Sequence, residues 1–139
     1  MKTTEVTRRG VLKGAVGAAI AFPYIVRSSA LGADGAVAPS NRITVGCIGV
    51  GGQGLYDMGM MMGLPDVQVV AVCDPKSEQR EKARALVNEH YKADTCQTYN
   101  DFRELTARDD IDVVQIASTD HWHVLHALAA VRSGKDVYV

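Results

Sequence analysis

Cysteine is scarce in this chain, and its spacing excludes two common ways of stabilising a small protein. Three cysteines occur in 139 residues, at positions 47, 73 and 96, and no two of them form a Cys-x-x-Cys motif. Neither a disulfide framework nor a zinc site is therefore indicated. We expect Cys47 and Cys73 to be small core residues in adjacent strands and Cys96 to lie in a loop. The sequence does not decide whether Cys47 and Cys73 form a disulfide bridge with each other.

The sequence also lacks an excess of either charge and an apolar run long enough to span a bilayer. Lys and Arg number 15 against 16 Asp and Glu, which gives a formal net charge of −1. Nucleic acid and anionic membrane surfaces are therefore not expected as partners. The apolar run over residues 14–26 falls short of the roughly 20 residues that a membrane-spanning helix needs.

The first 30 residues have the order of regions found in an export signal. Residues 7–13, Thr-Arg-Arg-Gly-Val-Leu-Lys, resemble the twin-arginine motif, with Val11 where phenylalanine is usual. The apolar run follows, and Ser28-Ser29-Ala30 offers small residues for cleavage. We predict a twin-arginine signal peptide over 1–30, a linker over 31–41, and export across the bacterial inner membrane to the periplasm by the twin-arginine machinery. The alternative is a basic start followed by an ordinary apolar helix.

A glycine-rich segment, Gly49-Val50-Gly51-Gly52-Gln53-Gly54, stands between a predicted strand and a predicted helix. The apolar residues 43–48 before it are typical of a buried strand, and apolar residues recur after it at helical spacing. A second strand, residues 67–73, ends at Asp74, twenty positions after Gly54. A GxGxxG motif in this context predicts a dinucleotide-binding site. The alternative is a glycine-rich turn with an unrelated acid.

Each part of this motif has a physical role. Gly49 permits the tight turn, Gly51 lets a pyrophosphate approach the backbone, and Gly54 lets helix and strand pack closely. The helix that begins near Gly52 presents free N–H groups to the phosphates. Asp74 can accept hydrogen bonds from the adenosine ribose. The cofactor-binding residues predicted from the motif are Gly49, Gly51, Gly52, Gln53, Gly54 and Asp74.

The choice between NAD and NADP depends on the residues around Asp74. Its carboxylate would repel a 2′-phosphate, so the sequence favours NAD. Lys76 and Arg80 lie close enough to pair with a phosphate, so NADP stays open, and Arg80 is added to the candidate cofactor-binding residues.

Strands alternate with helices along the rest of the chain. We predict strands at 43–48, 67–73, 97–99, 112–117 and 136–139, with helices from about 52, at 77–91, at 101–106 and at 122–133. Ser77 and Asn100 are the predicted helix caps, and Gly134 the predicted C-terminal glycine. The pattern predicts an α/β fold, a Rossmann-type doubly wound parallel sheet in three αβα layers. With five strands where six are usual, we expect the domain over 42–139 to be incomplete at its C-terminus.

Several segments together resemble one family of oxidoreductases. Residues 116–123, Ile-Ala-Ser-Thr-Asp-His-Trp-His, and residues 134–139, Gly-Lys-Asp-Val-Tyr-Val, are similar to the Gfo/Idh/MocA family, the relatives of glucose–fructose oxidoreductase and inositol dehydrogenase. Residues 98–105 and 72–74 fit the same family, so the resemblance covers about 42–139. It implies an NAD(P)-dependent enzyme for sugar or polyol hydroxyls, a homo-oligomer at full length, with a second α/β substrate domain absent from this chain.

The resemblance also implies roles for the loop after the fourth strand, which lies beside the nicotinamide half of the cofactor in the family. Ser118 stands at the family's threonine position, Thr119 at its proline position and His123 at its loop histidine. Loss of the proline makes the loop geometry less fixed. His123 either contacts the cofactor or serves in helix capping or packing. A metal cluster of His121, His123 and His126 lacks supporting carboxylates or cysteines, so no metal is predicted.

The family's Glu-Lys-Pro motif would begin directly after Val139, so no catalytic residue is predicted in this chain. We expect the nucleotide-binding part of an exported oxidoreductase that holds its NAD tightly, because little free nicotinamide nucleotide is available outside the inner membrane. Two alternatives are a glycosidase that uses NAD for transient oxidation and elimination, and a nucleotide-binding fragment without activity. Trp122 is expected to be a wall or core residue.

Overall fold

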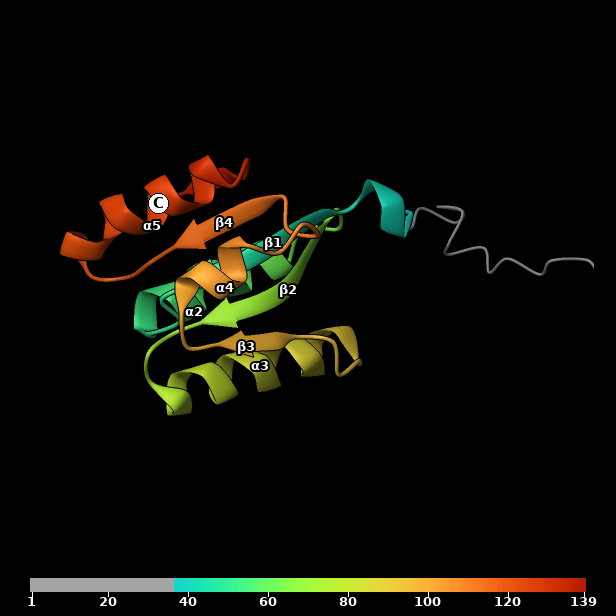
Figure 1. Cartoon of the computed structure of the whole chain (residues 1–139). Helices are drawn as coiled ribbons and strands as arrows, with labels where there is room; N and C mark the ends of the chain where they lie inside the picture. The colour runs from blue at the N-terminus through green and yellow to red at the C-terminus, as the bar shows by residue number, and fades with distance from the viewer. Residues whose placement is uncertain (1–36) are drawn as a thin grey trace, which may run out of the picture.

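The structure, a computed structural model, describes residues 37–139, in which five parallel strands alternate with helices (Figure 1). The predicted signal peptide and residues 31–36 of the predicted linker lie outside the described residues. The remainder of the predicted linker contains a short 3-10 turn, η3 (Pro39–Asn41). No helix of the described part is long and apolar enough to cross a membrane.

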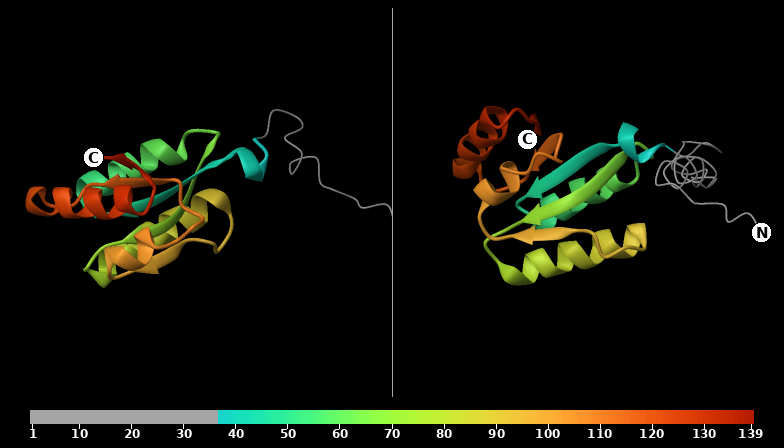
Figure 2. Two further views of the ribbon diagram at one scale, coloured as in Figure 1. Left: turned by 45° about the horizontal axis from the view of Figure 1, so that its top comes forward. Right: turned by 45° about the vertical axis from the view of Figure 1, so that its right-hand side comes forward.

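The sheet confirms the predicted doubly wound topology. Its strand order is β3-β2-β1-β4-β5, and every pair of neighbours is parallel. The same direction of β1, β2 and β3 is clear in the right-hand view of Figure 2. Strands are added to one side of β1 and then, after β3, to its other side, so the switch point lies between β1 and β4. The strands are β1 (Ile43–Ile48), β2 (Val67–Cys73), β3 (Gln97–Tyr99), β4 (Val113–Ile116) and β5 (Asp136–Tyr138).

Four helices cover the two faces of the sheet and give it two separate cores. They are α2 (Gly52–Met62), α3 (Ser77–Tyr91), α4 (Phe102–Thr106) and α5 (Asp120–Arg132). Met58 of α2 and Val87 of α3 pack with Val45 and Val69 on one face. Leu105 of α4 and Ala130 of α5 pack on the other. Figure 1 shows α4 in front of the sheet and α2 behind it. The predicted αβα layering is therefore confirmed.

The cysteines exclude the Cys47–Cys73 bridge that the sequence left open. Cys73 stands opposite Ile48 in the register of β1 and β2, one position from Cys47. Successive strand residues point to opposite faces, and the two thiols accordingly belong to different cores. All three cysteines are free and buried, Cys96 in the loop before β3 as predicted. Burial raises the pKa of Cys73 to about 12 and that of Cys96 to about 11, so both are protonated thiols.

Two predicted helix caps are wrong, although the helices themselves are present. Asp101, not Asn100, caps α4, because its Oδ1 accepts the Arg103 backbone N–H at 2.9 Å. Ser77 is the first residue of α3, and the cap position belongs to Lys76, which makes no side-chain hydrogen bond there. In each case a suitable polar residue stands one position from the true cap. Gly134 follows α5 at φ +75°, as the predicted C-terminal glycine requires.

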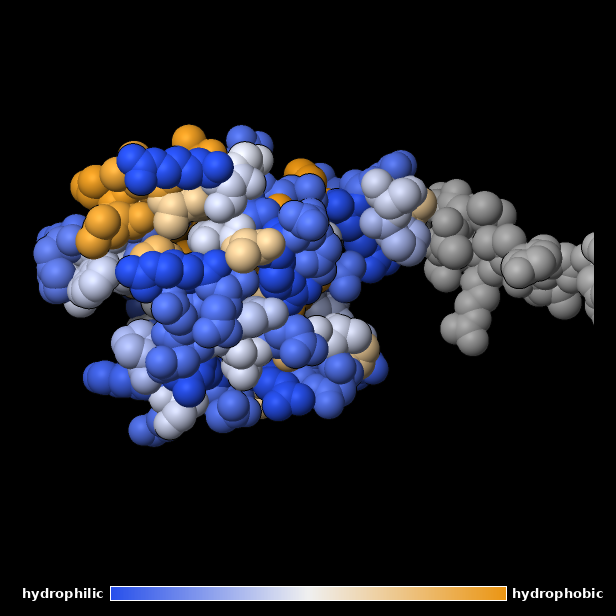
Figure 3. Space-filling view, viewed as in Figure 1, coloured by the Kyte–Doolittle hydropathy of each residue, from blue (hydrophilic) through white to orange (hydrophobic). Residues whose placement is uncertain are grey.

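The outer side of α5 differs from the rest of the surface. Val124, Leu125, Leu128 and Val131 of this helix are all exposed. Figure 3 shows the resulting apolar surface over α5, while most of the remaining surface in this view is hydrophilic. The predicted helix 122–133 begins two residues earlier in the structure, at Asp120.

Candidate functional site: a cavity at the carboxyl ends of the strands

A cavity of about 560 Å³ opens at the carboxyl ends of β1, β2, β3 and β4. It lies beside the switch point of the sheet, where open α/β sheets bind their ligands. Its lining is mixed, with apolar residues at the strand ends and polar or aromatic residues in the loops. The lining residues are Ile48, Gly49, Gly51, Cys73, Asp74, Pro75, Lys76, Gln79, Asn100, Asp101, Phe102, Arg103, Ala117, Ser118, Thr119, Trp122 and His126.

The glycine loop between β1 and α2 has two glycines that no other residue could replace without movement. Gly49 has φ +81°, and a Cβ on it would lie 2.6 Å from the Ser118 backbone nitrogen. A Cβ on Gly54 would lie 1.8 Å from the Gly49 carbonyl oxygen. These contacts let the first turn of α2 pack directly on the loop, as the motif predicts.

The other two glycines of the motif leave space for a ligand. A Cβ on Gly51 or Gly52 would meet nothing within 4 Å. Gly51 is the N-cap of α2 and has no side chain with which to cap the first N–H groups. An open, uncapped helix N-terminus binds phosphate through these N–H groups and the helix dipole. The cradle therefore fits the pyrophosphate of a dinucleotide.

Gln53 turns away from this cradle. Its amide nitrogen donates to Asp57 Oδ1 at 2.9 Å, one turn further along α2, and the residue does not line the cavity. Of the predicted motif residues, Gly49, Gly51 and Asp74 line the cavity.

Asp74 is held rigidly beside the glycine loop. Its side chain accepts the Val50 backbone N–H at 3.1 Å through Oδ2 and the Lys76 backbone N–H at 2.9 Å through Oδ1. The residue is only 9% exposed, yet it lines the cavity. Each carboxylate oxygen can accept a further hydrogen bond, so Asp74 is placed to receive ribose hydroxyls.

Arg80 is engaged elsewhere. Its guanidinium donates to the Asp74 carbonyl oxygen at 2.5 Å and to Asn100 Oδ1 at 3.1 Å. It thereby joins the end of β2 to the end of β3 and does not line the cavity. Arg80, predicted from the sequence as a cofactor-binding residue, therefore lies behind Asp74, where its hydrogen bonds hold the end of β2.

Two histidines of α5 hold the loop after β4. His123 Nε2 donates to the Ser118 carbonyl oxygen at 2.6 Å, and His126 Nδ1 lies 3.0 Å from Ser118 Oγ. Ser118 and Thr119 line the cavity, whereas His123 does not. Of the two roles left open for His123, the structure favours packing on the loop backbone. Burial, followed by the neighbouring His123 and Arg103, lowers the pKa of His126.

The geometry gives the three histidines hydrogen-bonding roles around one loop. His121 Nε2 lies 3.5 Å from Thr119 Oγ1. Among residues 37–139, no three His, Cys, Asp or Glu side chains converge as a metal site.

Trp122, predicted from the sequence to be a wall or core residue, lines the cavity together with Phe102 and His126, whose part in this aromatic wall was not predicted. Trp122 stacks on His126 with ring centroids 5.6 Å apart and planes at 17°, and Phe102 lies 4.5 Å from His126. Arg103 Cζ is 4.6 Å from the centroid of the Phe102 ring. The only sequence signal was the position of each residue, because Phe102 and Trp122 both follow the carboxyl end of a strand by a few positions.

Fold, cradle and fixed carboxylate together define a dinucleotide-binding Rossmann domain. Comparison with protein families agrees, since the family model for the NAD-binding Rossmann fold of the Gfo/Idh/MocA oxidoreductases matches residues 43–139. The chain belongs to this family.

Curated relatives resemble this chain over a limited part of their own length. A protein of Saccharopolyspora erythraea named "Glycosyl hydrolase family 109 protein" is 33% identical over 100 residues, which cover 70% of this chain and 22% of the relative. A "Glycosyl hydrolase family 109 protein 1" of Shewanella sp. (strain MR-4) is 35% identical over 109 residues, which cover 76% of this chain and 24% of the relative. The chain thus spans about a quarter of the length of these relatives.

Solved structures with the same fold include a myo-inositol dehydrogenase from Corynebacterium glutamicum, with TM-score 0.60 and 24% identity over 69% of this chain and 27% of that one. A biliverdin reductase from Synechocystis sp. PCC 6803, solved with biliverdin and NADP+, has a TM-score of 0.60 and 22% identity. The match covers 68% of this chain and 28% of the reductase. At this level of identity the likeness concerns the fold alone.

Proposed function

We propose that this chain is the nucleotide-binding part of an exported oxidoreductase that transfers hydride between a sugar or polyol hydroxyl carbon and a tightly held NAD. The observation that carries the proposal is the Asp74 carboxylate, fixed by two backbone N–H groups beside an open glycine cradle. Family membership supports the oxidoreductase class.

The same carboxylate favours NAD over NADP. A 2′-phosphate on the ribose would lie against the negative charge of Asp74, and desolvated like charges repel strongly. Arg80, one of the two cations that could compensate, already donates to Asp74 and Asn100. Lys76 is the other cation and lines the cavity. The proposal therefore takes NAD as the cofactor, with Lys76 as the residue that would accommodate a phosphate.

The chain's own residues have binding and orienting roles. The α2 N-terminus holds the pyrophosphate, and Asp74 holds the adenosine ribose. The Ser118–Thr119 loop, held by His123 and His126, supports the nicotinamide side. Bound NAD supplies the hydride acceptor. The proton of the substrate hydroxyl is assigned to residues outside this chain, in a second α/β substrate domain of the full-length protein.

Export is proposed from the basic, apolar and small-residue regions of residues 1–30. The twin-arginine route carries folded proteins, so NAD would be loaded in the cytoplasm and remain bound in the periplasm. The full-length protein is proposed to be a homo-oligomer that recycles this NAD internally.

A second candidate function is redox-assisted cleavage of a glycosidic bond. The names of the curated relatives favour it, because both are called glycosyl hydrolase family 109 proteins. In this reaction NAD would take hydride from a sugar hydroxyl carbon, elimination would expel the aglycone, water would add to the resulting double bond, and the hydride would return to the carbonyl, so the net reaction is hydrolysis without redox change. Turnover of a glycoside without any added electron acceptor separates it from a dehydrogenase.

The first test is to purify the full-length protein, denature it and identify the released nucleotide by mass spectrometry. We expect about one NAD(H) per chain, and then oxidation of a sugar or polyol only when an electron acceptor is added. Glycoside cleavage without an acceptor would establish the second candidate. A protein that carries no nucleotide and binds neither NAD nor NADP would contradict both, and NAD binding without any turnover would leave a nucleotide-binding protein alone.

A further inference from the structure

Gln115 is a fully buried polar residue in the middle of the sheet. It lies on β4, which borders β1 at the switch point, and its exposed fraction is 0%. Successive strand residues point to opposite faces, so Gln115 shares its face with Val113, which packs against the core under α2 and α3. An apolar side chain would fill this place without the desolvation that an amide requires.

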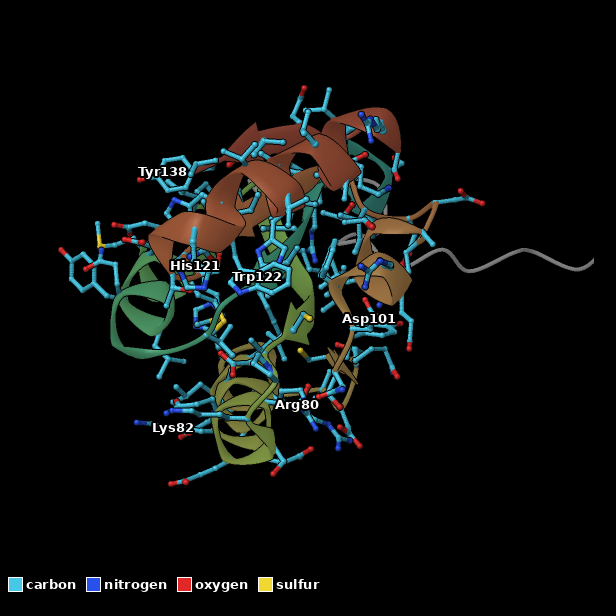
Figure 4. All side chains as sticks on the ribbon, turned by 60° about the vertical axis from the view of Figure 1, so that its left-hand side comes forward. Arg80, Lys82, Asp101, His121, Trp122 and Tyr138 are labelled. Carbon is cyan, nitrogen blue, oxygen red and sulfur yellow. The ribbon has the colours of Figure 1, made fainter. Side chains whose placement is uncertain are left out.

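The neighbours of Gln115 within the sheet do not account for the amide. The register places it opposite Cys47 of β1 and Tyr138 of β5. Cys47 is a buried thiol of the same core, and Tyr138 is 53% exposed at the outside of the molecule (Figure 4). The polar contact of Gln115 therefore comes from a helix.

The amide nitrogen of Gln115 reaches the first turn of α2. Its Nε2 donates to the Gly54 carbonyl oxygen at 3.3 Å. That carbonyl lies inside α2, where the regular helical pattern already supplies a donor from the next turn. The contact is thus an additional link between β4 and α2, and it is not needed to satisfy the Gly54 carbonyl.

The oxygen of the same amide has no such contact. Among residues 37–139, Gln115 Oε1 is the one buried side-chain nitrogen or oxygen without a hydrogen-bond partner. Turning the amide over would set Oε1 against the Gly54 carbonyl oxygen, so that two acceptors would face each other. The donor is therefore kept on Gly54 although an unpartnered buried acceptor destabilises the fold.

Gly54 is the residue at which α2 meets both loops of the switch point. A Cβ on it would lie 1.8 Å from the Gly49 carbonyl oxygen and 3.3 Å from Ala117 Cβ. A link from Gln115 to Gly54 holds the first turn of α2 against both loops. The free N–H groups at the start of α2 then keep a fixed position relative to a bound pyrophosphate.

We propose that Gln115 is a positioning residue for the pyrophosphate, because its amide holds the N-terminus of α2 at the distance from β4 at which the glycine cradle binds. Gln115 does not line the cavity and acts only through Gly54. This inference rests on the proposed function, since it requires a dinucleotide in the cradle. It predicts that the affinity for the ligand depends on the amide and that the stability of the fold does not.

The test is Gln115→Met in the full 139-residue chain, a substitution that keeps the length of the side chain and removes both polar atoms. Calorimetry measures the Kd for ADP-ribose, which contains the pyrophosphate, and for adenosine, which does not. We expect the Kd for ADP-ribose to rise about 5–10-fold and the Kd for adenosine to stay within about twofold. The urea midpoint should be unchanged or higher, because the unpartnered acceptor is gone.

Val113→Ala is the matched control, since Val113 lies two positions away on the same face of β4 and packs against the same core. It should lower the urea midpoint and leave the Kd for ADP-ribose within about twofold. Gln115→Leu repeats the test with a second apolar side chain.

Three results would overturn the assignment while the proposed function stands. The first is a Kd for ADP-ribose within about twofold of that of the unsubstituted chain, and the second is an equal loss of affinity for both ligands. The third is a lower urea midpoint, or failure to fold, in both Gln115→Met and Gln115→Leu, because the amide would then serve the core. If the unsubstituted chain binds neither NAD nor ADP-ribose, the inference and the proposed function are both wrong.

Discussion

A single added methyl group would test the glycine loop at the residue scale. In Gly54→Ala the new Cβ would lie 1.8 Å from the Gly49 carbonyl oxygen, so the loop or α2 must move. Overpacking of this kind costs about 1–3 kcal/mol of unfolding free energy. We expect a lower urea midpoint and loss of NAD binding, measured by circular dichroism and calorimetry.

Gly59→Ala is the matched control for this substitution. Gly59 lies in the same helix, and a Cβ on it would meet nothing within 4 Å. The substitution should therefore stabilise the protein by about 0.5–1 kcal/mol, because alanine loses less conformational entropy in a helix than glycine does. An unchanged urea midpoint for Gly54→Ala would contradict the packing described here.

At the residue scale, the sequence predicts only those site residues that belong to a motif of neighbouring positions along the chain. The glycine motif and Asp74 are read from spacing along the chain, and the structure brings them to one cavity. Arg80 was assigned to the cofactor because it is a nearby cation. Its actual partner, Asn100, is twenty positions away along the chain and becomes a neighbour only when β3 pairs with β2. No local pattern contains that information.

At the element scale, α5 and the loop before it act as one unit, and His126 is the residue that joins them. Its ring is 4.5 Å from Phe102 and hydrogen-bonded to Ser118, so it is buried and its pKa is lowered. Below the ordinary histidine pKa of about 6.5 the unfolded chain binds a proton that the folded chain resists. Stability should therefore fall as the pH falls through this value.

The measurement is a series of urea denaturations between about pH 7.5 and pH 5, because histidine side chains change their charge in the range of about pH 5–8. His126→Gln should flatten the dependence over this range, because the buried titrating group is gone. Asp101 and Asp112 are carboxylates whose pKa values are lowered by backbone hydrogen bonds, and they contribute at more acid pH. If the unfolding free energy of His126→Gln depends on pH as steeply as that of the unsubstituted chain, the pH dependence comes from another group.

Helices and strands were predictable because their periodicity is strong, and their ends were less so. The predicted strand 112–117 is one residue shorter at each end in the structure, Val113–Ile116, although the backbone N–H groups of Asp112 and Ala117 still donate to carbonyl oxygens of β1. Trp122 was predicted to be a wall or core residue, but its contacts with Phe102 could not be predicted, because the two residues come from helices that meet only in the folded chain.

At the scale of the whole molecule, ligand binding and stability are linked. A ligand at 100 times its Kd that binds only the folded state adds about 2.7 kcal/mol to the unfolding free energy. For a domain of about 100 residues each kcal/mol raises the Tm by about 4–8 °C. We expect saturating NAD to raise the Tm of the chain by about 10–20 °C in a thermal scan.

Asp74→Ala provides the control, because it removes the ribose-binding carboxylate and its hydrogen bonds to the glycine loop. Its Tm should respond to NAD much less than that of the unsubstituted chain. A Tm that does not change for the unsubstituted chain at millimolar NAD would show that this domain does not bind the nucleotide.

The parallel arrangement of the sheet separates ligand binding from half of the connecting loops. Every cavity residue stands near the carboxyl end of a strand, while residues 63–66, before β2, lie at the opposite end and are all exposed. Residues 63–66 are thus a site where a peptide tag or reporter domain could be inserted without disturbing the nucleotide. In this arrangement, substitutions in the loops at the carboxyl ends of the strands change ligand specificity. Insertions in the loops at the opposite ends change the length of the chain without reaching the cavity.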